Sequence, residues 1–199
     1  GVLAVYASRP VDAHRRRLVG EYADSVATAI SGAKRNRSLA AETVTELELQ
    51  LSDPGSLFAA LSRRLAERGE AGELTVRSAI DAGGEIRYFL TTEGVDPTHI
   101  REAAVELSDR IGTVETAGES GRVSLAVPKP TVESRLLNHG GVFIETTAEA
   151  GTAVVRAEYP RWTDVGDVID AVRELSPEVT VTTIRRVDRS TGSRRQGVA

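Results

Sequence analysis

The chain has 199 residues, of which 40% are apolar, 27% are charged and 4% are aromatic. These proportions are typical of one or two globular domains and exclude collagen-like and disordered chains. Cysteine and methionine are both absent, which excludes disulfides, thiolate metal sites and cysteine nucleophiles. Enzyme classes that depend on sulfur are therefore ruled out before any motif is considered.

The formal net charge of −4 hides an uneven distribution. Residues 1–41 and 185–199 each carry a net charge of +4, whereas residues 42–184 carry −12. Phosphate binding depends on clustered Lys and Arg, so the acidic central region should repel nucleic acid. No apolar run reaches the length of about 20 residues that a membrane-spanning helix needs, and no signal-peptide pattern opens the chain. We therefore expect a cytoplasmic protein without a membrane partner.

The N-terminal region predicts one strand and one long helix. The apolar run of residues 1–8 ends at Arg9-Pro10, which is typical of a buried strand stopped by proline. From Val11 to about Arg37, apolar residues recur at steps of three and four, which predicts a helix with one apolar face. These positions are Leu18, Tyr22, Val26, Ala29, Ile30 and Ala33. Because neither element has a partner nearby, we expect residues 1–38 to be the end of a domain whose remainder has been removed.

Residues 42–119 predict a first folded unit. Alternating apolar residues up to Leu51 indicate a strand, and Asp53-Pro54-Gly55 makes a turn that starts a helix. Two strands joined at Gly83-Gly84 follow as a hairpin. Asp96-Pro97 then caps a second helix, and a last strand lies near Val114. The order of elements is β-α-β-β-α-β.

Residues 120–188 repeat that order. A strand is followed by the turn Pro128-Lys129-Pro130, a helix that stops at Gly140-Gly141, a hairpin, a helix after Asp164, and a final strand from Val179. The sequence therefore predicts an α+β fold of two tandem ferredoxin-like units with antiparallel sheets. In each unit two helices would cover one sheet face, so the other face has apolar area for a twin unit or a second subunit to bury.

No residue pattern predicts catalysis or a cofactor. His14, His99 and His139 belong to three different elements, without a carboxylate at metal-ligand spacing. His139 is expected at a helix C-terminus, where an imidazolium favours the helix dipole. The chain has no G-x-S-x-G elbow, no Walker loop and no strand-linked G-x-G-x-x-G. We therefore assign no catalytic residue, no metal and no cofactor, and we expect a protein that is not an enzyme.

The two turns that join the first strand to the first helix of each unit are candidate ligand sites. Backbone N–H groups at a helix N-terminus can hold an anion or a carboxylate. The candidate residues are Asp53, Gly55 and Lys129, and the ligand class would be an amino acid or another carboxylate. The alternative is that proline and glycine simply start the helix at these points.

The C-terminal residues 189–199, with Arg185-Arg186 before them, have the composition of a flexible basic linker. Such a segment could touch DNA phosphates or could be a solvated hinge to a domain that has been removed. It contains no aromatic residue and no helix-turn-helix pattern, so it does not specify sequence readout.

Several of these segments resemble parts of haloarchaeal transcription regulators of the bacterio-opsin activator type. Residues 1–10, with the helix through residues 27–30, are similar to the last strand and final helix of a GAF sensor domain. Residues 43–54, followed by Phe58 and Leu61-Ser62, resemble the start of the domain that joins GAF to the DNA-binding domain. Members of that family continue into a C-terminal helix-turn-helix after a basic linker, which Ser193-Arg194-Arg195-Gln196 resembles. The resemblance implies that DNA is bound only through a C-terminal domain that is missing here.

The sequence thus predicts a regulatory module without enzymatic activity. The long helix would pass the state of a GAF-type sensor to the tandem unit, which would set the geometry of a helix-turn-helix domain. The signal would be transmitted through a homodimer, because the apolar stripe of residues 18–33 and the open sheet faces have apolar area that a second copy can bury. The alternative is that the tandem unit is itself a receptor for a small-molecule effector, of ACT-like type.

Overall fold

The computed structural model describes residues 41–107, 109–117 and 122–189, together with isolated positions between 12 and 39. The strand expected over residues 1–8, most of the helix expected from Val11 to Arg37, and residues 190–199 lie outside the described residues.

The described elements alternate as the residue patterns predict. In chain order they are β1 (Thr43–Leu51), α2 (Leu57–Glu67), β2 (Glu73–Asp81), β3 (Glu85–Glu93), α3 (Pro97–Glu106), β4 (Thr113–Ala117), β5 (Arg122–Pro128), α4 (Val132–Asn138), β6 (Val142–Glu149), β7 (Thr152–Pro160), α5 (Val165–Arg173) and β8 (Thr180–Asp188). The expected α+β class and the repeated β-α-β-β-α-β order are confirmed.

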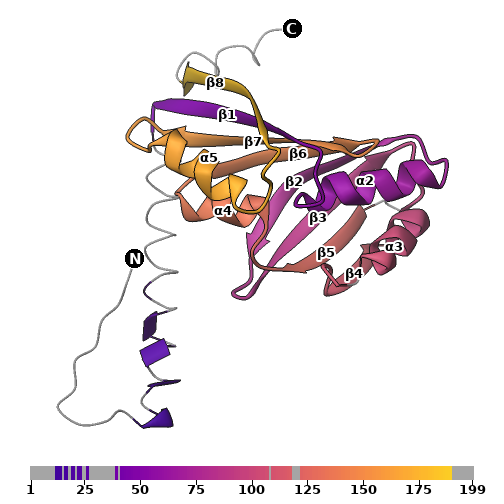
Figure 1. Cartoon of the computed structure of the whole chain (residues 1–199), viewed down its shortest axis with the longest axis horizontal. Helices are drawn as coiled ribbons and strands as arrows, with labels where there is room; N and C mark the ends of the chain where they lie inside the picture. The colour runs from indigo at the N-terminus through magenta and orange to yellow at the C-terminus, as the bar shows by residue number, and fades with distance from the viewer. Residues whose placement is uncertain are drawn as a thin grey trace, which may run out of the picture.

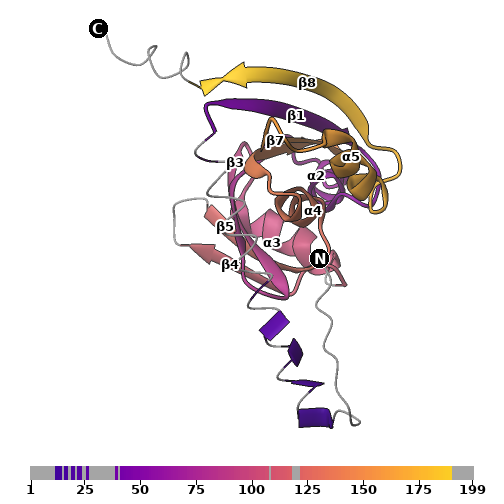
Figure 2. The ribbon, with the colours of Figure 1, turned by 90° about the vertical axis from the view of Figure 1, so that its left-hand side faces the viewer.

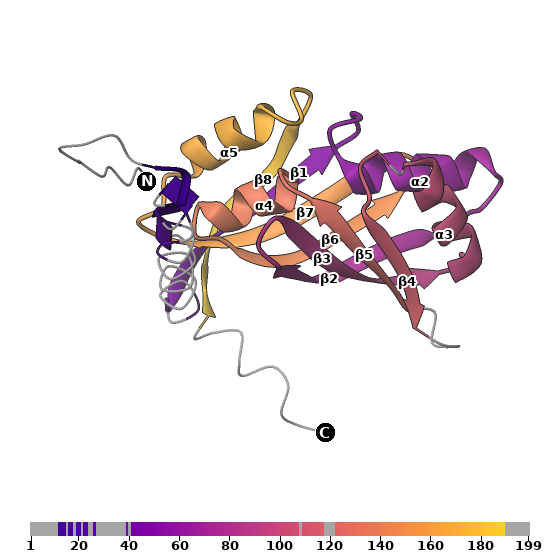
Figure 3. The same cartoon turned by 90° about the horizontal axis from the view of Figure 1, so that it is seen from below.

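The strands form one eight-stranded antiparallel sheet instead of the two separate sheets expected. Its strand order is β4-β5-β3-β2-β6-β7-β1-β8. The two halves of the sheet meet where β2 pairs with β6, in a short register from Leu74↔Ala148 to Val76↔Thr146. The four helices lie on one face of this sheet (Figures 1 and 3), and the strands curve around them (Figure 2).

The first strand of each repeat lies in the sheet half of the other repeat. Strand β5 pairs with β3 and β4, whereas β1 pairs with β7 and β8. Helix α2 packs beside α3 and also against β6 and β7, and α4 packs beside α5. The chain therefore crosses between the two halves twice, at residues 52–56 and at residues 129–131.

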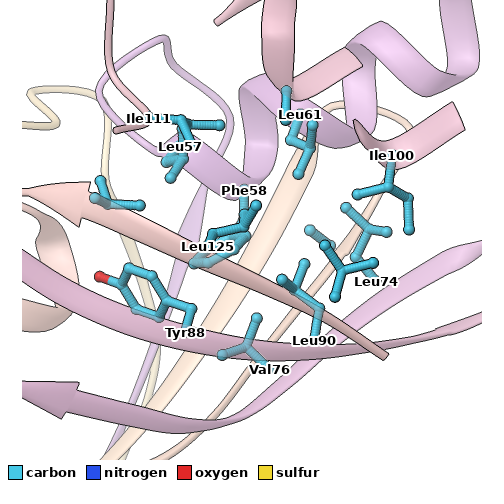
Figure 4. Packing of buried hydrophobic residues seen from close by; sticks show 14 of the residues in the cluster. Leu57, Phe58, Leu61, Leu74, Val76, Tyr88, Leu90, Ile100, Ile111 and Leu125 are labelled. Carbon is cyan, nitrogen blue, oxygen red and sulfur yellow. The ribbon is translucent and has the colours of Figure 1, made fainter. Parts of the chain in front are cut away.

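Two apolar clusters between the sheet and the helices follow from this exchange of first strands. The first contains buried side chains of α2, α3, β2, β3 and β5. Its centre is an edge-on contact between Phe58 and Tyr88, whose ring centroids are 5.0 Å apart (Figure 4). The second contains Leu47, Leu49 and Leu51 of β1 with side chains of β7, α4 and α5. Each cluster thus includes the first strand of the other repeat. The first cluster also includes Leu137 of α4, Ala148 of β6 and Ala153 of β7.

The sheet face opposite the helices carries ion pairs across several strands. Glu46 and Glu48 alternate with buried leucines on β1 and so point away from the helices. Arg185 pairs with Glu46 at 2.9 Å, and Arg156 of β7 pairs with Glu48 at 2.9 Å and with Glu145 of β6 at 2.8 Å. The apolar open face expected from the sequence is therefore charged along β8, β1, β7 and β6.

Candidate functional site

The two turns singled out in the sequence lie together at the crossings of the chain. A pocket of about 230 Å³ lies between them. It is lined by Gly55 and Leu57 of the first crossing, by residues 127–133 of the second, and by Asp109 and Arg110 after α3. The exchange of β1 and β5 explains why two turns 75 positions apart face one pocket, since both crossings pass between the same two sheet halves.

Asp53 stabilises the first crossing turn through hydrogen bonds of its carboxylate. Its Oδ1 accepts the N–H of Gly55 at 2.7 Å, and its Oδ2 accepts the Ser176 hydroxyl at 2.5 Å and the N–H of Glu178 at 3.2 Å. The side chain is buried and does not line the pocket. Both carboxylate oxygens are thus occupied by the turn itself and by the turn that follows α5.

Gly55 takes part in the pocket through its backbone. A Cβ atom at this position would lie 1.9 Å from the carbonyl oxygen of Leu175, so only glycine fits against the turn after α5. Its own carbonyl accepts a hydrogen bond from Arg110 at 3.1 Å. Gly55 therefore shapes the pocket wall without offering a side chain to a ligand.

Lys129 lines the pocket from the second crossing. Its Nζ is 2.7 Å from Asp81 Oδ1 at the end of β2, and its N–H donates to the carbonyl of Gly84 at 3.1 Å. The ammonium charge is thus matched by a carboxylate within the same half of the sheet.

Arg110 is a pocket residue that sequence reasoning missed. Its guanidinium donates to the carbonyls of Pro54 at 2.6 Å and Gly55 at 3.1 Å. Burial lowers the pKa of this guanidinium, while the nearby carboxyl groups of Asp109, Asp53 and Glu133 act in the opposite direction. Within residues 41–107, 109–117 and 122–189, however, no ion pair joins Arg110 to any carboxylate. An arginine in a turn carries no periodic signal, so nothing in the residue pattern selects it.

A second missed residue, Glu133, is buried beneath the pocket at the start of α4. The Tyr88 hydroxyl donates to its Oε2 at 3.0 Å, and the Thr146 hydroxyl lies 3.2 Å from its Oε1. The Tyr88 hydroxyl is also 2.7 Å from Thr131 Oγ1. Burial raises the pKa of the Glu133 carboxyl, because removal from water disfavours the charged form. This cluster joins β3, α4 and β6 across the two halves.

The points where the chain enters and leaves the sheet form a second notable site. Thr43 at the start of β1 pairs with Asp188 at the end of β8. The N–H of Arg189 donates to the carbonyl of Glu42 at 2.8 Å, and its side chain donates to the carbonyl of Leu39 at 3.1 Å and to Glu158 Oε2 at 3.0 Å. Arg189 therefore ties the incoming and outgoing segments together.

The described residues offer no metal cluster. Among them, no group of three or more His, Cys, Asp and Glu side chains is placed to hold a metal ion. His139 is the C-cap residue of α4, the helix-end position expected for it. No helix in the described part of the chain is long and apolar enough to cross a membrane.

Comparison with known families places the chain. A family model described as "BAT: GAF and HTH_10 associated domain" matches residues 42–198. This range includes every strand of the eight-stranded sheet. No curated protein matches the chain.

Proposed function

The chain belongs to the BAT family of domains associated with GAF and HTH_10 domains, and from this premise we propose that it couples a GAF-type sensor to a C-terminal helix-turn-helix. The family connects the chain to transcription regulators and not to any family of enzymes. In the proposed arrangement DNA is bound by the helix-turn-helix, and the acidic central region takes no part in phosphate contacts.

The observation that carries this proposal is the pairing of the first and last strands at one end of the sheet. A sensor attached before Glu42 and a DNA reader attached after Arg189 would leave the domain from adjacent strands. Arg189 hydrogen-bonds to the incoming backbone at Leu39 and Glu42 and to Glu158 on β7. A shift of the incoming segment would change these bonds directly, so the signal would not need to cross the whole domain.

Dimerisation is part of the proposal, as the means by which the sensor would act on the helix-turn-helix. The apolar stripe predicted over residues 18–33 supports a helix-to-helix contact between two copies. The open sheet face offers less support, because Glu46, Glu48 and Arg156 are already matched within one chain, and apolar area is what stable dimer interfaces bury. We therefore assign the dimer contact to the helix predicted from Val11 to about Arg37.

We also interpret the domain as two ferredoxin-like units that have exchanged their first strands. The repeated order of elements supports this interpretation, as does the matching position of each exchanged strand between the third and fourth strands of the other unit.

The coupling role can be tested in a regulator that carries this domain between its sensor and its helix-turn-helix. We expect Arg189→Gln to leave DNA affinity unchanged while abolishing the dependence of transcription on sensor state. Arg186→Gln, an exposed change on β8 three residues before Arg189, is the matched control and should respond normally. A normal response from Arg189→Gln would overturn the proposal. A monomer in light scattering at high protein concentration would overturn the dimer.

A further inference from the structure

The pocket between the crossing turns holds a guanidinium that makes no ion pair with the residues that the structure describes. Arg110 is half-buried and lines the pocket, and its hydrogen bonds run to neutral carbonyls of Pro54 and Gly55. A guanidinium has five N–H donors, so the bonds to these two carbonyls leave donors available. A cation removed from water is costly unless an anion compensates it.

The other ionisable groups of the pocket do not cancel this charge. Lys129 is paired with Asp81, so these two groups balance each other. Glu133 is bound by hydroxyls of Tyr88 and Thr146, and its burial favours the uncharged acid. Asp109 is exposed to water, where its field is strongly screened. The Asp53 carboxyl lies near Arg110 and raises its pKa, but both Asp53 oxygens are hydrogen-bonded to Gly55, Ser176 and Glu178. Arg110 can therefore take an anionic ligand as its ion-pair partner.

The remaining walls of the pocket indicate the polarity of that ligand. Five apolar residues contribute to them, namely Leu57, Val127, Pro128, Pro130 and Val132. A pocket of about 230 Å³ has room for a small organic acid, since a single water molecule needs only about 10–15 Å³ of such space. An anionic group could lie beside Arg110 and a short apolar chain against these residues.

We propose that this pocket binds a small organic carboxylate with a short apolar chain, and that Arg110 is the residue that binds its carboxylate. The site goes beyond the coupling function and does not depend on it. Because Gly55 and Thr131 belong to the two crossings, a bound ligand would contact both halves of the sheet at the point where the chain passes between them. Occupancy would then favour the arrangement in which the halves are held together.

Titration calorimetry on this chain tests the proposal with three probes. Isovalerate carries the carboxylate and the branched apolar chain, leucine adds an ammonium group, and inorganic phosphate supplies a negative charge alone. We expect isovalerate to bind and Arg110→Gln to weaken binding at least tenfold. If leucine also binds and loses affinity in the same variant, the class widens to amino acids. If phosphate binds and neither carboxylate does, the assignment to an organic carboxylate is wrong.

Two further variants separate ligand binding from stability. Arg63 also donates to backbone carbonyls, those of Ser52 and Gly151, but does not line the pocket, so Arg63→Gln should keep the affinity for isovalerate. Pro128→Trp would place a large side chain in the pocket without removing the bonds of Arg110, and it should abolish binding. No binding by the unaltered chain, or binding by Arg110→Gln and Pro128→Trp as tight as that of the unaltered chain, would refute the site. Since these measurements need no sensor or DNA, their failure would leave the coupling proposal standing.

Discussion

Asp53 and Ser176, which are 123 positions apart in the sequence, are joined by a hydrogen bond of 2.5 Å between the Ser176 hydroxyl and Asp53 Oδ2. The same carboxylate holds the N–H groups of Gly55 and Glu178. It thereby ties the turn after β1 to the turn after α5.

Loss of this carboxylate should destabilise the whole domain. Hydrogen bonds to charged groups contribute more than neutral ones, and the buried partners would be left unsatisfied. We expect Asp53→Ala to lower the free energy of unfolding by about 2–3 kcal/mol in urea denaturation. Asp170→Ala removes an exposed carboxylate that, among the described residues, pairs only with Arg173, and it should lower the free energy of unfolding by less than about 0.5 kcal/mol. Equal effects of the two variants would contradict the anchoring role.

Gly55 should tolerate no side chain. A Cβ at this position would meet the Leu175 carbonyl oxygen at 1.9 Å, whereas a Cβ at Gly84 would meet nothing within 4 Å. We expect Gly55→Ala to lower the free energy of unfolding by about 2 kcal/mol or more through overpacking. Gly84→Ala should change it by less than about 1 kcal/mol. A Gly55→Ala protein as stable as Gly84→Ala in thermal denaturation would show that the turn can move.

The order of elements could be predicted from the sequence because it depends on local signals. Asp96 and Asp164 are N-caps of α3 and α5, as their positions before each helix indicate. The exchange of first strands could not be predicted. The alternating leucines of β1 and the alternating apolar residues of β5 bury the same kind of face, so either strand fits either half by pattern alone.

The candidate site was predictable only in part, for a related reason. Helix-start chemistry draws attention to Asp53, Gly55 and Lys129, since proline and glycine are visible in the sequence. Arg110 and Glu133 belong to the pocket because of packing between distant segments. Glu133 in particular lies one position into a helix where acidic residues are common, so its complete burial leaves no trace in the residue pattern.

Glu133 should make stability depend on pH. Its folded pKa is raised by burial above the unfolded value of about 4.3, so the folded state holds the proton more tightly than the unfolded state. The resulting loss of stability begins as the pH rises above the unfolded pKa and is complete above the folded pKa. We therefore expect Glu133→Gln, which cannot ionise, to gain stability relative to the unaltered chain between pH 4 and pH 7 in denaturant titrations. A difference that stays constant over this range would argue against a raised pKa.

The ion pairs on the open sheet face should contribute to the free energy of unfolding by an amount that depends on salt concentration. Glu145 lies 2.8 Å from a guanidinium nitrogen of Arg156 and 3.6 Å from one of Arg77. We expect Glu145→Gln to lower the free energy of unfolding by about 1 kcal/mol at low ionic strength. The effect should shrink at about 1 M salt, where the screening length is about 3 Å. A cost that does not change with salt would indicate packing and not charge.

Exchange of the first strands predicts that neither repeat folds alone. A fragment of residues 42–119 contains β1, whose leucines pack in the cluster of the other half, and lacks β5, which lies between β3 and β4. A fragment of residues 120–189 has the converse defect. We expect each fragment alone to give the poorly dispersed NMR spectrum of an unfolded chain, and an equimolar mixture to recover dispersed signals, because the mixture restores every strand pairing. If the fragment of residues 42–119 folded alone as a monomer, β1 would have to pair with β3 in the place of β5. The exchange of strands would then result from linking the two repeats, and their sequences would not require it.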